Sequence, residues 1–323
     1  MRMAADILTV ENVTKSFGNL RALDGVSLGV RDRKVSILIG PNGSGKTTLI
    51  NVVSGVYKPE SGRVIFDGID VTGHPPHSLY KRGIVRTFQI PALFWKLTVL
   101  ENLLVAEKNN PGESLFRSIR INGFRSRRDF GAPWIDTRAG WRVIHGLFSL
   151  KNLVQHRRVM RKLFRERALV SFLNSLLTLS LSPWKRFFTL EWRQAETHAT
   201  EKAARILGLL GLSSMWNQPA YLLSGGQMKL VEIGRALMSD AKLLLLDEPV
   251  SGVNPTLAHE IFSRILKLRD ELGLTFFIVE HRLDVALKYV DDMFVMALGR
   301  LIASGLPDEV MNNKKVIEAY LGG

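Results

Sequence analysis

Residues 40–47 read Gly40-Pro41-Asn42-Gly43-Ser44-Gly45-Lys46-Thr47, and Thr48 follows them. The stretch matches the pattern G-x-x-x-x-G-K-[ST] at every fixed position, between an apolar run at 35–39 and a helix that we expect to begin at Leu49. Glycines let a backbone wrap an anion with its N–H groups inward, and a helix N-terminus adds positive charge. We therefore predict a phosphate-binding loop, with Lys46 reaching the β- and γ-phosphates and the Thr47 hydroxyl holding Mg²⁺.

A second apolar run, residues 243–246, ends at Asp247 and Glu248. Continuous apolar runs of this length, like those at 35–39 and 275–279, are typical of parallel strands covered on both faces. Parallel sheets bind ligands at the carboxyl ends of their strands. Alone, the pair could be an ordinary solvated turn, but beside the phosphate loop we expect Asp247 to bind Mg²⁺ and Glu248 to polarise the attacking water.

A third motif lies just before this run and reads Leu223-Ser224-Gly225-Gly226-Gln227, followed by a helix-like stretch at 228–238. Ser224 and the glycine N–H groups at a helix start suit a γ-phosphate. With this pentapeptide in place the chain resembles the ATP-binding cassette (ABC) family, in which it is the signature motif. The resemblance implies that residues Ser224, Gly225, Gly226 and Gln227 contact ATP held by the phosphate loop of another subunit, so that two chains meet head to tail.

The same resemblance implies roles for residues outside these three motifs. Gln89 matches the family's Q-loop glutamine, a metal and water ligand, and His281 matches the switch histidine that senses the γ-phosphate. Phe17 matches an aromatic residue that stacks on adenine, although by itself it would be a core residue, and His281 by itself a surface or helix-cap residue. Residues 251–254 resemble the D-loop, which crosses to the other subunit, with Asn254 where the family often has Asp.

The fold class that follows is α/β: a P-loop NTPase core of the ABC nucleotide-binding type, an antiparallel β subdomain and an enlarged α-helical subdomain. We expect one ABC domain over residues 6–323, with its core at 6–98 and 223–323 and its helical subdomain at 99–222. Asn254 and Pro255 predict a helix start, and Gly273 its end.

Composition excludes several kinds of chemistry. The chain has 323 residues and no cysteine, so disulfides, thiolate metal sites and cysteine nucleophiles are absent. No secretory signal is recognisable, and the longest uncharged stretch, 168–184, is short for a bilayer span and rich in serine. We expect a peripheral protein on the cytoplasmic face of the membrane, attached through a partner or an interfacial segment.

Most of the net charge of +14 lies between residues 111 and 200, which hold 17 Lys and Arg against 6 Asp and Glu. Four tryptophans, Trp134, Trp141, Trp184 and Trp192, lie in the same range. An amphipathic stripe at 169–177 belongs to a basic insertion that we expect at about 111–189. We predict contact with an anionic membrane surface or with the permease. The alternative is that the stripe packs on the helical subdomain, and nucleic acid is an unlikely partner because no recognition motif is present.

The resulting functional prediction is an ATP-binding and ATP-hydrolysing subunit that energises an ABC membrane transporter. Its predicted partners are integral membrane permease subunits and a second ABC ATPase subunit, as a homodimer or a heterodimer. Residues 280–282, the D-loop and the C-terminal segment 316–323 resemble the ATP-binding subunits of branched-chain amino-acid importers. Alternatives are related subunits for urea, amides or lipopolysaccharide, a soluble non-transport ABC ATPase, and a non-hydrolysing regulatory nucleotide binder.

Overall fold

The computed structural model describes residues 6–87, 92–108 and 183–321. Its contacts divide the chain into two units, residues 1–108 with 206–323 and residues 109–205. We call the first the core unit. The predicted insertion at 111–189 lies almost entirely outside the described residues, so its structure and the predicted subdomain boundaries stay predictions.

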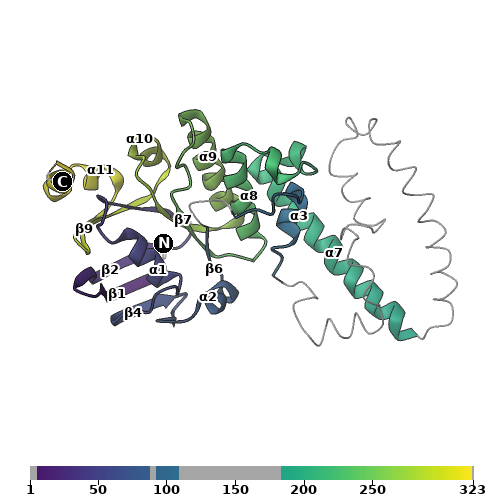
Figure 1. The fold of residues 1–323 in the computed structure, drawn as a ribbon, viewed down its shortest axis with the longest axis horizontal. Helices are drawn as coiled ribbons and strands as arrows, with labels where there is room; N and C mark the ends of the chain where they lie inside the picture. Colours follow the sequence, from purple (N-terminus) through teal and green to yellow (C-terminus); the bar gives the residue numbers. More distant parts are fainter. Residues whose placement is uncertain (1–5, 88–91, 109–182, 322–323) are drawn as a thin grey trace, which may run out of the picture. The chain divides into compact units, whose positions relative to one another are not determined.

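A six-stranded sheet forms the centre of the core unit, in the order β10-β9-β3-β8-β7-β6 (Figure 1). Neighbouring strands are parallel except for the antiparallel edge pair β9 and β10. The predicted parallel strands are confirmed at β3 (Val35–Ile39), β7 (Leu243–Asp247) and β8 (Thr275–Val279). The other strands are β6 (Ile84–Arg86), β9 (Asp292–Ala297) and β10 (Arg300–Gly305).

A four-stranded antiparallel sheet, in the order β2-β1-β4-β5, confirms the antiparallel element expected near the N-terminus. Its strands are β1 (Asp6–Phe17), β2 (Leu20–Arg31), β4 (Ser61–Phe66) and β5 (Ile69–Asp70). Alternating buried side chains of β1 and β2 join a hydrophobic cluster with helix α1 (Lys46–Val53) and the central strands. Burial of this cluster therefore fixes the position of α1 against both sheets.

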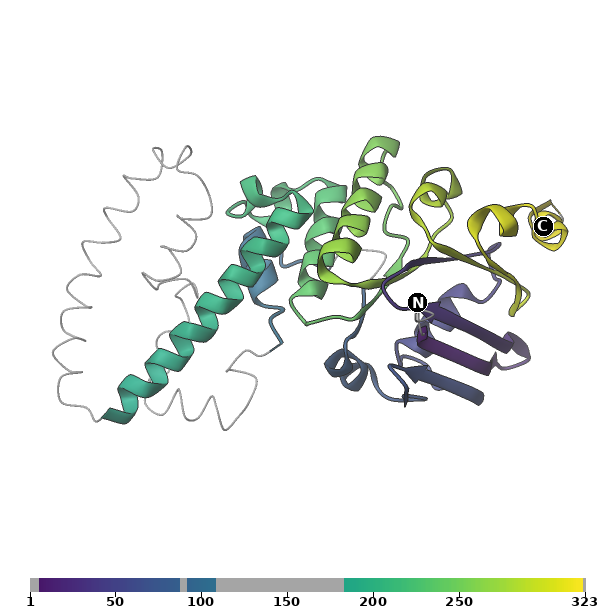
Figure 2. The ribbon, with the colours of Figure 1, turned by 180° about the vertical axis from the view of Figure 1, so that it is seen from behind.

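Helices α8 (Gly225–Leu237) and α9 (Pro255–Leu272) lie side by side in both views of the ribbon (Figures 1 and 2). Helix α9 has the predicted ends: the Asn254 side chain caps its first turn by accepting from the Leu257 N–H at 2.9 Å. Gly273 closes it with φ 65°, a left-handed conformation that favours glycine.

One predicted helix start is wrong by three residues, and another is confirmed. Helix α1 begins at Lys46 instead of Leu49, because Gly45 at φ 101° ends the loop and its carbonyl already accepts from the Leu49 N–H at 2.9 Å. Helix α8 begins at Gly225, as expected from a helix start at Ser224 and the glycines, because Ser224 and Gln227 form a capping box. The helix-like stretch at 228–238 is therefore preceded by one further helical turn. Lys46 and the signature glycines therefore belong to the first turns of helices.

The remaining helices of the described chain are shorter, apart from α7 (Pro183–Leu210), which crosses the boundary between the two units. They are α2 (Pro76–Arg82), α3 (Val99–Leu104), α10 (Leu283–Ala286), α11 (Pro307–Met311) and α12 (Lys314–Leu321). Within residues 6–87, 92–108 and 183–321, no helix combines the length and apolar character needed to cross a bilayer.

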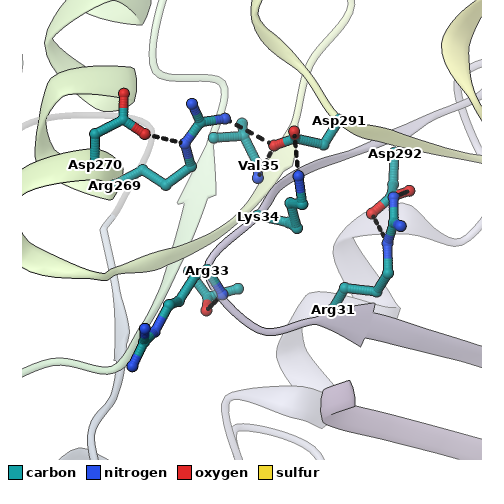
Figure 3. A network of polar contacts seen from close by, with 9 residues as sticks. Arg31, Arg33, Lys34, Val35, Arg269, Asp270, Asp291 and Asp292 are labelled. Carbon is teal, nitrogen blue, oxygen red and sulfur yellow. Dashed lines mark hydrogen bonds and ion pairs between the residues drawn. The ribbon is translucent and has the colours of Figure 1, made fainter. Parts of the chain in front are cut away.

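A charged network braces the amino ends of β3 and β9 (Figure 3). Asp291 accepts from the Val35 N–H, from Lys34 and from Arg269 at the end of α9, each at 2.9 Å. Beside it Arg31 of β2 forms a salt bridge with Asp292. The network lies at the opposite end of β3 from the phosphate loop, so it can stabilise the strand without entering the site.

Candidate functional site

The phosphate loop follows β3 directly, and glycine is required at both of its ends. A Cβ on Gly40, at φ 150°, would lie 2.1 Å from the Met296 carbonyl oxygen. A Cβ on Gly45, at φ 101°, would lie 2.4 Å from the Ala22 carbonyl oxygen. The loop is therefore pressed against a neighbouring backbone at position 40 and against another at position 45, and only glycine fits at these two positions.

Lys46 is folded into this loop. Its Nζ donates to the carbonyl oxygens of Gly40 at 2.8 Å and Pro41 at 2.9 Å, and the residue is only 6% exposed. Burial lowers the pKa of Lys46, while the nearby carboxylates of Glu248 and Asp247 act in the opposite direction. The loop lysine and the two acidic residues at the carboxyl end of β7 are thus brought into one electrostatic site.

Strand register explains why these groups meet. Leu38 of β3 pairs with Val279 of β8, and Val279 pairs in turn with Asp247 of β7. The carboxyl ends of all three strands therefore lie at one edge of the sheet, the position predicted for the site.

Asp247 is held by an arginine that the sequence reasoning missed. Arg86 of β6 donates from Nη2 to Asp247 Oδ2 at 2.9 Å, and the two side chains are only 12% and 14% exposed. The same guanidinium also contacts Asn51 and Ser54 of α1 and its C-terminal cap. Arg86 therefore ties the metal-binding candidate to the helix that follows the phosphate loop.

Glu248 has a left-handed backbone, with φ 49°. Its N–H donates to the Val279 carbonyl at 2.9 Å, and its carboxylate Oε1 lies 3.1 Å from His281 Nε2. Glu280, which is 1% exposed, accepts from the backbone N–H of His281 at 3.0 Å. Glu248 and His281, which were each predicted as site residues, are thus in direct contact. Glu280 orients the segment that carries the histidine.

The signature motif forms the first turn of α8. Ser224 Oγ accepts from the Gln227 N–H at 3.4 Å, and Gln227 Oε1 accepts from the Ser224 N–H at 2.9 Å. A Cβ on Gly225 would meet nothing within 4 Å, whereas one on Gly226 would lie 2.3 Å from Leu257 Cδ2 on α9. The backbone at Gly225 therefore faces open space, which an anion could approach, and Gly226 packs α8 closely against α9.

Phe17, at the end of β1, is 43% exposed and lies edge-on to Tyr57 with 5.2 Å between ring centroids. Its exposure contradicts the alternative of a buried core residue. Lys15 lies over the ring, 5.6 Å from its centroid. An aromatic surface of this kind suits stacking against a flat heterocycle.

The described residues also present oxygen ligands of the kind that Mg²⁺ prefers. Thr47 is exposed in the first turn of α1, and its neighbour Thr48 is half-buried. Asp247 is partly accessible at the end of β7. Among the described residues no group of three or more His, Cys, Asp or Glu could hold a metal by itself. Magnesium bound by few protein ligands and by substrate phosphates needs no such group.

One predicted site residue is not described, and two buried charged residues were not predicted. Gln89 lies outside the described residues, so its predicted role is not tested. Lys229 of α8 and Glu280, both buried, were missed because the sequence around a charged residue does not indicate its partner.

Comparison with known proteins gives the family of the chain. The ABC transporter family profile matches residues 23–251, and a profile described as branched-chain amino acid ATP-binding cassette transporter matches residues 300–323. A Methanocaldococcus jannaschii protein named "Probable branched-chain amino acid transport ATP-binding protein LivG" is 41% identical over 326 residues, covering 100% of both chains. A protein of the same name from Archaeoglobus fulgidus is 40% identical, covering 98% of this chain and 95% of its own.

A more distant relative is the Pseudomonas aeruginosa "High-affinity branched-chain amino acid transport ATP-binding protein BraF", 32% identical over 99% of both chains. Among solved structures, a nucleotide-free ATP-binding cassette from an ABC transporter matches with TM-score 0.67 and 39% identity, over 98% of this chain and 100% of its own. The ADP conformation of an ABC transporter cassette matches with TM-score 0.68, over 98% and 99% of the chains. The expected family and fold class are confirmed: the chain belongs to the ABC transporter family, as an ATP-binding subunit.

Proposed function

We propose that this chain hydrolyses ATP at the site formed by residues 40–48, Asp247, Glu248 and His281, and thereby drives a transporter of branched-chain amino acids. The observation that carries the chemistry is the 3.1 Å contact between Glu248 and His281 at the sheet edge where Lys46 lies. A carboxylate and an imidazole in contact can hold and orient a water molecule for attack on a phosphate.

The proposed roles follow from position. The loop N–H groups and Lys46 bind the phosphates, with Lys46 exchanging its two loop carbonyls for phosphate oxygens. Thr47, Asp247 and Gln89 would hold Mg²⁺, which when bound neutralises charge on the phosphates. Glu248 accepts a proton from the attacking water, and His281 contacts the γ-phosphate. Phe17 stacks on adenine, which its exposed ring supports.

We propose further that two such cassettes close over ATP, with Ser224–Gln227 of one chain facing the phosphate loop of the other. The capping box uses the N–H groups of Ser224 and Gln227, so the N–H groups of Gly225 and Gly226 in the first turn are left to bind an anion. These groups and the open space at Gly225 support this role. Whether the second cassette is another copy of this chain or a related subunit is answered by the size and composition of the complex formed with ATP.

An exposed apolar cluster is the proposed contact for the permease subunits. Its residues are Phe94, Trp95, Tyr221 and Leu222, exposed by 48%, 53%, 59% and 61%. The two segments are joined where the Tyr221 N–H donates to the Trp95 carbonyl at 3.2 Å, just before the signature motif. Exposed apolar clusters of this kind are typical of protein interfaces. Trp95→Asp should leave ATPase activity intact and weaken co-purification with the permease.

The branched-chain substrate rests on the names of the full-length relatives and on the C-terminal profile. Such a complex would place this chain on the cytoplasmic face of the membrane. The test is uptake of labelled leucine, urea and acetamide by vesicles containing the complete transporter. ATP-dependent leucine uptake supports the proposal. Uptake of urea or acetamide alone would favour a related system, and ATPase activity that never responds to a permease would favour a soluble ABC ATPase.

A further inference from the structure

Glu248 has a backbone conformation that its own side chain does not favour. A residue with a Cβ at φ 49° persists only where the surrounding structure holds it. The main chain on both sides of Glu248 is therefore the place to look for the contacts that aim its carboxylate.

One of those contacts comes from the signature helix. Lys229 Nζ donates to the Glu248 carbonyl oxygen at 2.8 Å, and the Ser251 N–H donates to the same oxygen at 3.1 Å. The Ser251 bond is local to the turn after Glu248, whereas the Lys229 bond joins a different element, α8. Lys229 is only 9% exposed, and burial lowers its pKa, opposed by Glu280, Glu232 and Glu248.

Lys229 lies five residues after Ser224 on the same helix, about 7.5 Å along its axis. In the proposed dimer, the two ends of this short segment therefore lie at two different nucleotides. Ser224 faces ATP held by the partner cassette, whereas Glu248 acts on ATP held by its own loop.

We propose that Lys229 is a positioning residue for hydrolysis: it holds the main chain of Glu248 so that the carboxylate meets His281 and the attacking water, and it connects that carboxylate to the phosphate-facing end of α8. This inference rests on the proposed function. As a consequence, a shift of α8 on binding of the partner's nucleotide should change the orientation of the Glu248 carboxylate at the ATP site of its own phosphate loop.

The competing explanation is purely structural, because a buried lysine also neutralises the neighbouring Glu280 and Glu232. The two explanations differ in turnover. If Lys229 positions Glu248, then its loss should lower kcat and leave ATP affinity unchanged, since Lys46 and the loop are untouched. It should also have no effect once Glu248 itself has been replaced.

The experiment measures kcat, KM and thermal midpoint of the full-length chain carrying Lys229→Met, Lys229→Arg or Lys229→Gln, each with and without Glu248→Gln. Lys242→Met is the matched control: it removes the same charge at the opposite end of β7, where the side chain is 56% exposed and paired with Asp67. ATP affinity is measured separately with a fluorescent ATP analogue in the Glu248→Gln background.

The expected result is a loss of about 10- to 100-fold in kcat for Lys229→Met with KM and ATP affinity within about twofold, because small misplacements of a reacting group cost this much. Lys229→Arg should recover part of the loss, and Lys229→Met should cause no further loss in the Glu248→Gln background. Wild-type kcat in a folded Lys229→Met protein, or the same fold loss in both backgrounds, would overturn the inference.

Two outcomes keep the test decisive. If Lys229→Met does not fold, Lys229→Gln is compared with Lys229→Arg, and a Gln variant as active as the Arg variant overturns the inference. Wild-type turnover in Glu248→Gln alone would instead refute the proposed function, so that the two failures are distinguishable.

Discussion

The guanidinium of Arg86 lies 2.9 Å from the carboxylate of Asp247, and the two side chains are only 12% and 14% exposed. Each ion therefore depends on the other for compensation in a poorly hydrated place. Removing one partner of such a pair leaves an uncompensated charge, which costs more than the pair itself contributes.

Arg86→Met should accordingly lower the free energy of unfolding by about 3–5 kcal/mol, the usual cost of breaking a buried pair from one side. Denaturant unfolding without nucleotide measures this loss. Saturating Mg²⁺ and ATP should restore part of it, because a cation beside Asp247 replaces the missing guanidinium. Arg63→Met is the control, since its pair with Glu11 is exposed and should contribute less than about 1 kcal/mol. Equal losses for the two variants would contradict the role given to Arg86.

Glu248→Gln should lower ATP turnover by about 10²- to 10⁴-fold, because an amide cannot accept the proton of the attacking water. ATP binding should persist, since the loop and Lys46 are unchanged, and the ATP-bound form should accumulate as a dimer. Phosphate release and the molecular mass in solution with ATP are the two measurements. Wild-type turnover in this variant would contradict the assignment of Glu248.

The phosphate loop makes a steric prediction. Gly45→Ala should lower the thermal midpoint strongly, because its Cβ would lie 2.4 Å from the Ala22 carbonyl oxygen at a φ of 101°. Gly43→Ala is the matched control: it also has positive φ, 77°, but a Cβ there meets nothing within 4 Å. It should cost only the conformational strain, about 1–2 kcal/mol. A Gly43 variant as unstable as the Gly45 variant would show that crowding is not what requires glycine at 45.

The bounds of helices and strands could be predicted from the sequence where they depend on neighbouring residues alone. The apolar runs at 35–39 and 275–279 predicted β3 and β8 to the residue, and Asn254 and Gly273 predicted both ends of α9. The start of α1 was missed because it depends on the left-handed φ of Gly45, which a pattern of residue types does not reveal.

Long-range polar partners could not be predicted. Arg86 meets Asp247 across 161 residues of sequence, and Lys229 meets Glu248 across 19. In both cases only the three-dimensional arrangement supplies the group that compensates the buried charge. The family resemblance implied separate roles for Glu248 and His281, but their contact was not predicted and is seen only in the structure.

The brace at the far end of β3 predicts an acid limit to stability. Burial by itself would raise the pKa of Asp291, but the Val35 N–H, Lys34 and Arg269 outweigh it and hold the pKa below its usual value. A lowered carboxyl pKa stabilises the fold fully above the unfolded-state pKa of about 3.9 and loses that contribution as the pH falls through the folded-state value.

The free energy of unfolding should therefore decrease as the pH is lowered below about 4, and we call this decrease the acid limb. Asp291→Asn should remove part of this pH dependence. Chemical unfolding between pH 2.5 and 7 measures it. Asp270→Asn removes an equal charge from a carboxylate that is 62% exposed and bound to the same Arg269, so it should change the acid limb less. An identical acid limb in wild type and Asp291→Asn would refute the assigned contribution.

The central claim is that ATP is held between two cassettes, the phosphate loop of one facing the signature turn of the other, and the absence of native cysteine makes it directly testable. Chains carrying Asn42→Cys are mixed with chains carrying Gly225→Cys, both in the Glu248→Gln background, and disulfide formation is followed with ATP, with ADP and without nucleotide. A nucleotide shared between two cassettes should give a mixed Asn42→Cys/Gly225→Cys disulfide that forms rapidly with ATP and slowly otherwise. Failure of ATP to promote this disulfide, in variants that still bind ATP, would contradict the shared site.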